Sequence, residues 1–178
     1  MQTQDKIARD MIQGLAILIV DHNQQSRRLT KTMLTTLGAK SVYEATDGLA
    51  ALDLLRNNNI DVMVLDRDVP VLSAPELLSF VRSPDLFPKP DLPVIMLVAG
   101  ARRQDAIDAL RAGAHELLLK PTSPKALQDR LLSVLLNPRK LVRIGNAYVP
   151  EPRRQAQQPM GNAGRAGNVP ARPIGATA

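Results

Sequence analysis

The sequence predicts a doubly wound α/β fold built on one parallel sheet, and three observations support this. From Leu15 onward, short β-branched apolar segments alternate with longer segments of helical periodicity. The first, third and fourth of these segments are apolar almost throughout, as expected of strands that helices cover on both faces. The chain has 178 residues, enough for one domain with a substantial core.

Five strands are predicted, and a helix follows each of them. The strand ranges are Leu15 to Val20, Ser41 to Ala45, Asp61 to Leu65, Pro93 to Val98 and Glu116 to Leu119. Strict alternation of this kind is typical of repeated βα units.

The first helix has clear start and stop residues. Asn23 is a good N-cap, and the helical pattern runs to Leu37 before Gly38 stops it. The spacing of its apolar residues predicts an inner face formed by Leu29, Met33, Leu34 and Leu37.

The other four helices carry similar signals. Ser73 with Glu76 forms a capping box, Gly113 stops the fourth helix, and Pro124 suits the first turn of the fifth. The fifth helix places Leu127, Leu131, Val134 and Leu135 on its inner side. The four helices cover about 47–56, 73 onward, 102–112 and 123 onward.

The composition excludes several classes of function. With no Trp, two Phe and two Tyr, the core must be aliphatic, and stacking on nucleic-acid bases is poorly supported. The absence of Cys excludes disulfides and thiolate metal sites. No segment has the length and apolarity of a signal peptide or a membrane span. We therefore expect a cytoplasmic protein without a DNA-binding domain.

Charge divides the chain into a neutral body and a basic tail. Up to Asn137 there are 16 Lys and Arg against 16 Asp and Glu, so the net charge of +6 comes from the 7 basic and 1 acidic residues that follow. Residues 138–178 are rich in Pro, Gly and Arg and have no sustained period. This predicts a flexible tail, apart from a docked piece around Leu141 to Tyr148. Residues 1–14 are an N-terminal extension, and 15–137 form the domain.

Polar residues stand where the predicted strands end. Asp21 and His22 follow the first strand, Asp66 and Asp68 the third, and Lys120 the fifth, while Val98 and Ala99 end the fourth. Because the carboxyl ends of parallel strands meet at one rim of a sheet, carboxylates, an imidazole and an ammonium group are expected to lie together there.

These residues resemble the receiver domain of two-component response regulators. The resemblance covers Leu15 to about Asn137 and rests on "LIVD", "VMVLDRDVP", "PVIMLVA" and "AGAHELLLKP". The spacings between Asp21, Asp66, Val98 and Lys120 (66 − 21 = 45, 98 − 66 = 32, 120 − 98 = 22) are also similar to those of the family. The resemblance implies a flavodoxin-like (βα)5 fold with strand order 2-1-3-4-5.

The resemblance also implies a function for the rim. Asp66 would accept a phosphoryl group from the phosphohistidine of a histidine kinase or phosphotransfer protein. Mg²⁺ would be bound by Asp21, Asp66 and the main-chain carbonyl of Asp68, Lys120 would contact the phosphoryl group, and Ala99 would leave room for it. A carboxylate can act as a nucleophile toward phosphorus once a cation and an ammonium group offset the charge repulsion. The Asp68 side chain is either a plain loop carboxylate or a group that orients water.

Three residues depart from the family pattern. His22 stands where a second acidic residue usually binds Mg²⁺, which should weaken metal binding because Mg²⁺ prefers oxygen. The sequence favours a tolerated replacement here over a ligand for another metal. Val98 stands where a Thr or Ser usually donates to the phosphoryl group, and Leu117 where an aromatic switch residue is usual. Phosphorylation would therefore shift the conformational equilibrium only slightly.

Three functions remain open on the sequence alone. The first is a stand-alone receiver in a phosphorelay that signals by protein contact, not an enzyme, and dimerising through its fourth and fifth helices. The second is a degenerate receiver that binds partners without phosphorylation. The third is a haloacid-dehalogenase-like phosphatase, because "DRD" resembles the paired aspartates of that family. That family has its aspartate pair on the first strand and a second acidic pair late in the sequence. In this chain the pair lies on the third predicted strand and no late acidic pair follows Lys120, which disfavours the phosphatase.

Overall fold

The computed structural model of the chain describes residues 2–100, 102–145 and 147–151. Its main feature is a parallel sheet of five strands in the order β2-β1-β3-β4-β5, as the flavodoxin-like prediction requires. The strands are β1 (Ala16–Val20), β2 (Ser41–Ala45), β3 (Val62–Asp66), β4 (Val94–Val98) and β5 (Glu116–Leu119). Each lies within one residue of its predicted range at either end.

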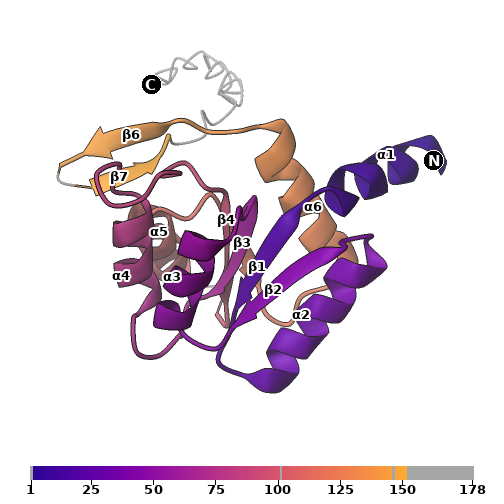
Figure 1. Cartoon of the computed structure of the whole chain (residues 1–178), viewed down its shortest axis with the longest axis horizontal. Coiled ribbons are helices and arrows are strands. Elements are labelled where there is room, and N and C mark those ends of the chain that lie inside the picture. The colour runs from indigo at the N-terminus through magenta and orange to yellow at the C-terminus, as the bar shows by residue number, and fades with distance from the viewer. Residues whose placement is uncertain (1, 101, 146, 152–178) are drawn as a thin grey trace, which may run out of the picture.

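Helices cover both faces of this sheet, so the molecule has three layers (Figure 1). On one face lie α3 (Gly48–Asn57), α4 (Ala74–Val81) and α5 (Arg103–Ala112), and on the other α1 (Gln2–Gln13), α2 (Gln24–Thr36) and α6 (Pro124–Leu136). Alternate residues of the central strands enter two separate aliphatic cores, with Leu18 and Met63 in one and Ile17 and Val62 in the other. This explains why β1 and β3 are apolar on both faces.

The register of the strands aligns their carboxyl ends. Val20 pairs with Leu65, Asp66 with Leu97, and Val98 with Leu119. The residues that follow these pairs therefore begin the loops at one rim of the sheet, as predicted.

Most helix boundaries follow the predicted signals. The Asn23 side chain accepts a hydrogen bond from the Ser26 amide at 2.9 Å, and the Glu76 carboxylate accepts one from the Ser73 amide at 2.9 Å. Gly113 ends α5 in the left-handed conformation, with φ of 107°. The prediction for Leu29 is wrong: its side chain is exposed, and the adjacent Thr30 is buried instead. At the start of α2, the buried face is therefore shifted by one residue from the predicted one.

Two ordered elements lie outside the predicted strands and helices. Helix α1 occupies the N-terminal extension and buries Ile12 completely in the core that α2 and α6 share. Strands β6 (Leu141–Ile144) and β7 (Ala147–Pro150) form an antiparallel hairpin that contacts α5. The hairpin lies where a docked piece was predicted, around Leu141 to Tyr148, so this part of the predicted flexible tail is ordered. The remainder of that tail, from residue 152, lies outside the described residues.

The hairpin is anchored at the amino end of the sheet, opposite the predicted site (Figure 1). The Arg139 guanidinium donates to the carbonyl of His115, just before β5, and to that of Glu151 at 3.3 Å. Val149 on β7 is buried. Over the part of the chain that the structure describes, no helix is both long enough and apolar enough to cross a membrane.

Candidate functional site

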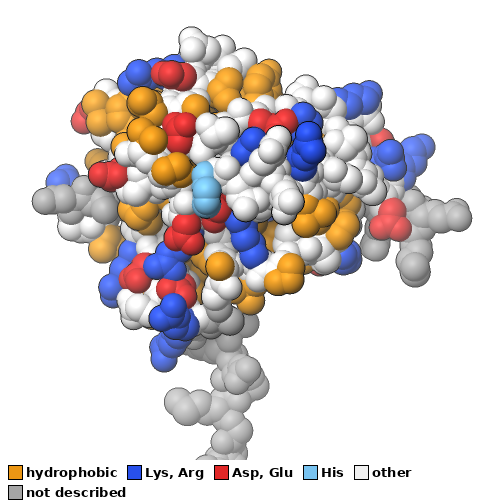
Figure 2. All heavy atoms as spheres, turned by 90° about the horizontal axis from the view of Figure 1, so that it is seen from below, with side chains coloured by type: hydrophobic (Ala, Val, Ile, Leu, Met, Phe, Trp, Pro, Cys, Tyr) orange, Lys and Arg blue, Asp and Glu red, His pale blue; other side chains and the backbone are white. Residues whose placement is uncertain are grey.

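The structure brings the predicted site residues to one hollow at the carboxyl rim of the sheet. Its lining includes His22, Asp66, Asp68, Ala99 and Lys120. The exposed Leu29, which was predicted to face the core, also lines it. Figure 2 shows this face of the molecule, with a histidine side chain at the surface and acidic and basic side chains directly beside it. Asp21 lies beneath the hollow and is completely buried.

Asp21 is held as an ionised carboxylate by several donors. Its Oδ1 accepts from the Asn23 amide at 2.8 Å, and its Oδ2 accepts from the Ser26 hydroxyl at 2.5 Å and from Lys120 Nζ at 2.9 Å. Burial alone would raise the pKa of Asp21, but the hydrogen bonds from Ser26, Lys120 and Asn23 together outweigh it and lower the pKa. The carboxylate is therefore charged at neutral pH.

Lys120 joins the two buried carboxylates. Its Nζ lies 2.8 Å from Asp66 Oδ2 and 2.9 Å from Asp21 Oδ2, at the end of β5, before a cis peptide bond to Pro121. Burial lowers the pKa of Lys120, but the hydrogen bonds to Asp66 and Asp21 outweigh that effect and raise it. The ammonium group thus neutralises one of the two carboxylate charges. Asp66 Oδ1 has a weaker contact, with the Asp68 amide at 3.4 Å.

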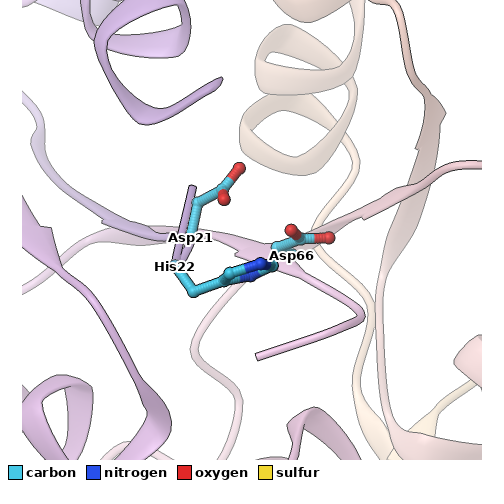
Figure 3. A group of neighbouring side chains, drawn as sticks. All are labelled: Asp21, His22 and Asp66. Carbon is cyan, nitrogen blue, oxygen red and sulfur yellow. The ribbon is translucent and has the colours of Figure 1, made fainter. Parts of the chain in front are cut away.

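His22 completes a group of three candidate metal ligands. One ligand atom from each of Asp21, His22 and Asp66 can be chosen so that all lie within 4.8 Å of one another. Figure 3 shows the His22 ring extending from the end of β1 toward the Asp66 carboxyl group. The two carboxylates are buried, whereas His22 is exposed. The sequence placed these residues at one rim but could not show that their ligand atoms converge.

Two further predicted residues lie beside the hollow rather than in it. Val98 is buried, and Leu117 is half-buried against the same core cluster, on the face that α3, α4 and α5 cover. Neither side chain carries a hydrogen-bond donor. The exposed Ala99 does line the hollow, and its small side chain leaves space beside Asp66 and Lys120.

Sequence reasoning missed contacts that support the site. It identified Asn23 as a helix cap, but not the bonds from Asn23 and Ser26 to Asp21. It also missed the ion pair of Arg67, next to Asp66, with Asp105 in the first turn of α5, at 2.5 Å. This pair joins residues 38 positions apart, and only the fold brings them together. The Asp66 loop is thereby linked to α5.

The loop that follows Asp66 is tightly placed. The amide of Gly48, at the start of α3, donates to the Pro70 carbonyl at 3.4 Å. A Cβ at residue 48 would lie 2.0 Å from the Leu72 carbonyl oxygen, so only glycine fits. Val71 in this loop has a positive φ of 69°, which is unfavourable for a β-branched residue. Backbone strain is thus stored in the loop that follows Asp66.

Comparison with known proteins identifies the family. The sequence model of the response regulator receiver domain matches residues 17–132. The chain belongs to the receiver domain family of response regulators. Receivers of this family act in two-component signalling, and the matched range contains the parallel sheet except for Ala16, the first residue of β1.

Several chemotaxis proteins are similar to this receiver. The CheY homolog of Campylobacter jejuni is 34% identical over 122 residues, which cover 68% of this chain and 92% of that protein. CheY-3 of Vibrio cholerae is 35% identical over 118 residues, covering 66% of this chain and 89% of that protein.

Solved receiver structures share the fold. A putative response regulator from Chloroflexus aurantiacus superposes with a TM-score of 0.64 at 28% identity, covering 69% of this chain and 98% of that one. The receiver domain of a sensor histidine kinase from Pseudomonas aeruginosa gives a TM-score of 0.61 at 28% identity, covering 67% and 95%. That structure has a magnesium ion coordinated in its active site cleft.

The ligand atoms of this receiver only partly suit Mg²⁺. Receivers usually bind this ion, which requires oxygen ligands in near-octahedral geometry. Asp21 and Asp66 supply oxygen, but the third candidate atom is an imidazole nitrogen of His22. Imidazole suits ions such as Zn²⁺, Cu²⁺ and Ni²⁺ better than Mg²⁺.

Proposed function

We propose that this receiver accepts a phosphoryl group on Asp66 from the phosphohistidine of a histidine kinase or phosphotransfer protein, and signals through contact with another protein. The observation that carries the proposal is the position of Lys120, whose ammonium group bridges the buried Asp66 and Asp21 carboxylates at 2.8 and 2.9 Å. Such an ammonium group can neutralise charge that develops on the phosphoryl oxygens.

In the proposed reaction, an Asp66 oxygen attacks phosphorus and the phosphorus–nitrogen bond of the donor breaks. An acyl phosphate forms on Asp66, and the electron pair of the broken bond goes to the donor imidazole nitrogen, which takes a proton from solvent. Asp66 Oδ1, which has only the long 3.4 Å contact, would hold the cation, and Oδ2, which accepts from Lys120 at 2.8 Å, would then attack phosphorus. A bound divalent cation would offset the remaining negative charge.

The partners follow from this role. The upstream partner would be a histidine kinase or phosphotransfer protein, and the similarity to chemotaxis proteins suggests a target protein bound by direct contact. The Arg67–Asp105 ion pair supports α5 as part of the responding surface, because it joins the acceptor loop to that helix. A homodimer through α5 and α6, the fourth and fifth predicted helices, belongs to the same proposal.

A second candidate function is a receiver that binds partners without being phosphorylated. It is favoured by Val98 and Leu117, which carry no hydroxyl or aromatic group to report a phosphoryl group. A hydrogen bond to a charged group stabilises by roughly 1.5 to 3 kcal/mol, and Val98 cannot give this stabilisation to a phosphorylated state.

Labelling with acetyl phosphate tests the first candidate. The wild type, incubated with acetyl phosphate and a divalent cation, should gain the mass of one phosphoryl group, and Asp66→Asn should gain none. Asp68→Asn is the matched control, because it changes an exposed carboxylate two residues away and should still be labelled. Equal labelling of wild type and Asp66→Asn would overturn the proposal.

The second candidate gives the opposite result in the same experiment. The wild type would remain unlabelled by acetyl phosphate and by kinases of the source organism, and Asp66→Asn would still signal in cells. Signalling that is lost with Asp66→Asn and kept with Asp68→Asn would exclude the second candidate.

A further inference from the structure

The ligand atoms at the rim differ in how many other partners they have. Asp21 Oδ2 accepts from both Ser26 and Lys120, and Asp66 Oδ2 accepts from Lys120. Asp21 Oδ1 accepts one bond, from the Asn23 amide, and Asp66 Oδ1 has the weak 3.4 Å contact. These two oxygens keep lone pairs for a cation. The exposed His22 ring adds a nitrogen at the open side of the hollow.

The charge of this ligand set is low. Two carboxylates and the Lys120 ammonium group leave one net negative charge, and a neutral imidazole adds none. A second acidic residue in place of His22 would bring the net charge to two negative. Binding of Mg²⁺ depends mainly on negative charge and oxygen ligands, whereas transition-metal ions also gain from a nitrogen ligand.

We propose that this rim binds a divalent first-row transition-metal ion in preference to Mg²⁺, through one oxygen each of Asp21 and Asp66 and an imidazole nitrogen of His22. The inference deepens the proposed function and rests on it for its biological role, because it names the class of cation at the same site. Zn²⁺ and Co²⁺ are suitable probes.

Metal binding requires the ligand atoms to close on the ion. Two ligands of a tetrahedral zinc ion, each at about 2.1 Å from the metal, lie about 3.4 Å apart. The three ligand atoms lie within 4.8 Å of one another, so the widest pair has to approach by at most about 1.4 Å. The Asp21 carboxylate is fixed by its donors, whereas the exposed His22 can close the gap by rotating its side chain.

The chain offers few competing sites for such ions. It contains two histidines and no cysteine. The other histidine, His115, is buried, and its Nδ1 contacts the Val94 amide at 3.2 Å and the Arg82 guanidinium at 3.1 Å. His22 is therefore the accessible imidazole, and spectroscopic signs of nitrogen coordination can be assigned to it.

The test is calorimetric titration of the tag-free full chain with Zn²⁺ and Mg²⁺ separately. His22→Asp replaces the nitrogen by a carboxylate on an exposed side chain. It should lower the ratio of Zn²⁺ to Mg²⁺ affinity at least about tenfold and raise Mg²⁺ affinity. His22→Ala should weaken Zn²⁺ binding without raising Mg²⁺ affinity. His115→Asn, at the other histidine, should leave the wild-type ratio unchanged.

Co²⁺ gives a second, spectroscopic readout that does not depend on activity. The wild type should show visible d–d absorption bands of bound Co²⁺ and shifted NMR signals of the His22 ring, and His22→Ala should lose the nitrogen-coordinated bands. A Zn²⁺ to Mg²⁺ ratio that is the same in wild type and His22→Asp, or unshifted His22 signals at saturating Co²⁺, would overturn the inference.

The two proposals fail in different ways. Zn²⁺ binding through His22 in a protein that acetyl phosphate never labels would leave the metal inference standing and overturn phosphorylation. Labelling of Asp66 with no role for His22 in cation choice would do the reverse.

Discussion

The two ends of the parallel sheet both contain buried charge, but they use it differently. At the carboxyl end, Lys120 bridges Asp21 and Asp66, and an exposed imidazole lies beside them. At the amino end, the buried Arg82 guanidinium donates to the carbonyls of Gly113 at 2.8 and 3.0 Å, Pro90 at 2.7 Å and Leu92 at 2.8 Å. The buried carboxylates at the carboxyl end are paired with the Lys120 ammonium group, whereas the buried Arg82 guanidinium at the amino end is hydrogen-bonded to backbone carbonyls.

The polar groups at the carboxyl end can therefore exchange partners, whereas those of the Arg82 network at the amino end cannot. Lys120 could exchange a carboxylate for a phosphoryl oxygen, because the hollow opens to solvent beside it. Arg82 has no such freedom, since its neighbours are backbone carbonyls and the His115 ring. Strain follows the same division: within the described chain, Val71 in the loop that follows Asp66 is the one non-glycine residue with positive φ.

The largest expected effect comes from breaking the amino-end network. Arg82→Met should lower the free energy of unfolding by about 3 kcal/mol, because it leaves buried carbonyls of Gly113, Pro90 and Leu92 without their donor. Urea denaturation measures this. Arg111→Met on the exposed face of α5 is the control and should change stability by less than about 0.5 kcal/mol. Equal losses in the two variants would show that the Arg82 network contributes no stability.

A pH dependence should also arise at the amino end. Burial, with the charges of Arg82 and Arg139, lowers the pKa of His115 to about 3. The unfolded chain binds a proton at the ordinary pKa of about 6.5, so the stability that depends on neutral His115 is lost as the pH falls from about 6.5 toward 3. At pH ~4.5 this amounts to about 2 to 3 kcal/mol.

The variant His115→Asn isolates this dependence, because it keeps a hydrogen-bond acceptor near the position of Nδ1 but does not titrate. Its free energy of unfolding should fall less than that of the wild type between pH 7 and pH 4.5. Parallel pH profiles for the two proteins would contradict the assignment.

At the carboxyl end, the ion pairs of Lys120 should contribute less stability than the Arg82 network. Lys120→Met should lower the free energy of unfolding by about 1 to 3 kcal/mol at pH 7, because it leaves two buried carboxylates without their shared cation. The hydrogen bond from Lys120 helps to lower the pKa of Asp21, so the loss should shrink as the pH falls and this carboxylate protonates in the variant. Lys125→Met, at the exposed pair with Asp129, is the control and should have almost no effect.

The smallest expected effect is a gain. Val71→Asn should raise the free energy of unfolding by about 0.5 to 1 kcal/mol, because asparagine tolerates a positive φ better than valine and the side chain is exposed. Thermal unfolding of wild type and variant measures it. A loss of stability would mean that the Val71 side chain contributes contacts larger than the strain.

The regular part of the fold could be predicted because its signals are local. The strand ranges follow from short apolar segments, and Asn23, Ser73 and Gly113 mark helix ends through bonds to nearby backbone. The N-terminal helix was missed because its charged residues hide an apolar face that ends at Ile12. Leu29 was misplaced because periodicity does not show which neighbouring residue, here Thr30, meets the core.

The features that could not be predicted depend on tertiary contacts. The hairpin is held by a hydrogen bond from Arg139 to the His115 carbonyl, and no local sequence pattern predicts that bond. The rim was predicted from strand ends, but the bridge from Lys120 to both carboxylates spans 54 and 99 residues of sequence. Spacing alone cannot give the distances that make the His22 nitrogen a candidate ligand.

Phosphorylation of Asp66 is tested by an NMR titration with beryllofluoride, a mimic of the phosphoryl group, with Mg²⁺ and with Zn²⁺ in turn. We expect shifted signals in the loops after β1, β3, β4 and β5, unchanged signals for Arg82 and His115, and no response in Asp66→Asn. A wild-type protein that does not respond with either cation, or an equal response in Asp66→Asn, would contradict phosphorylation of Asp66.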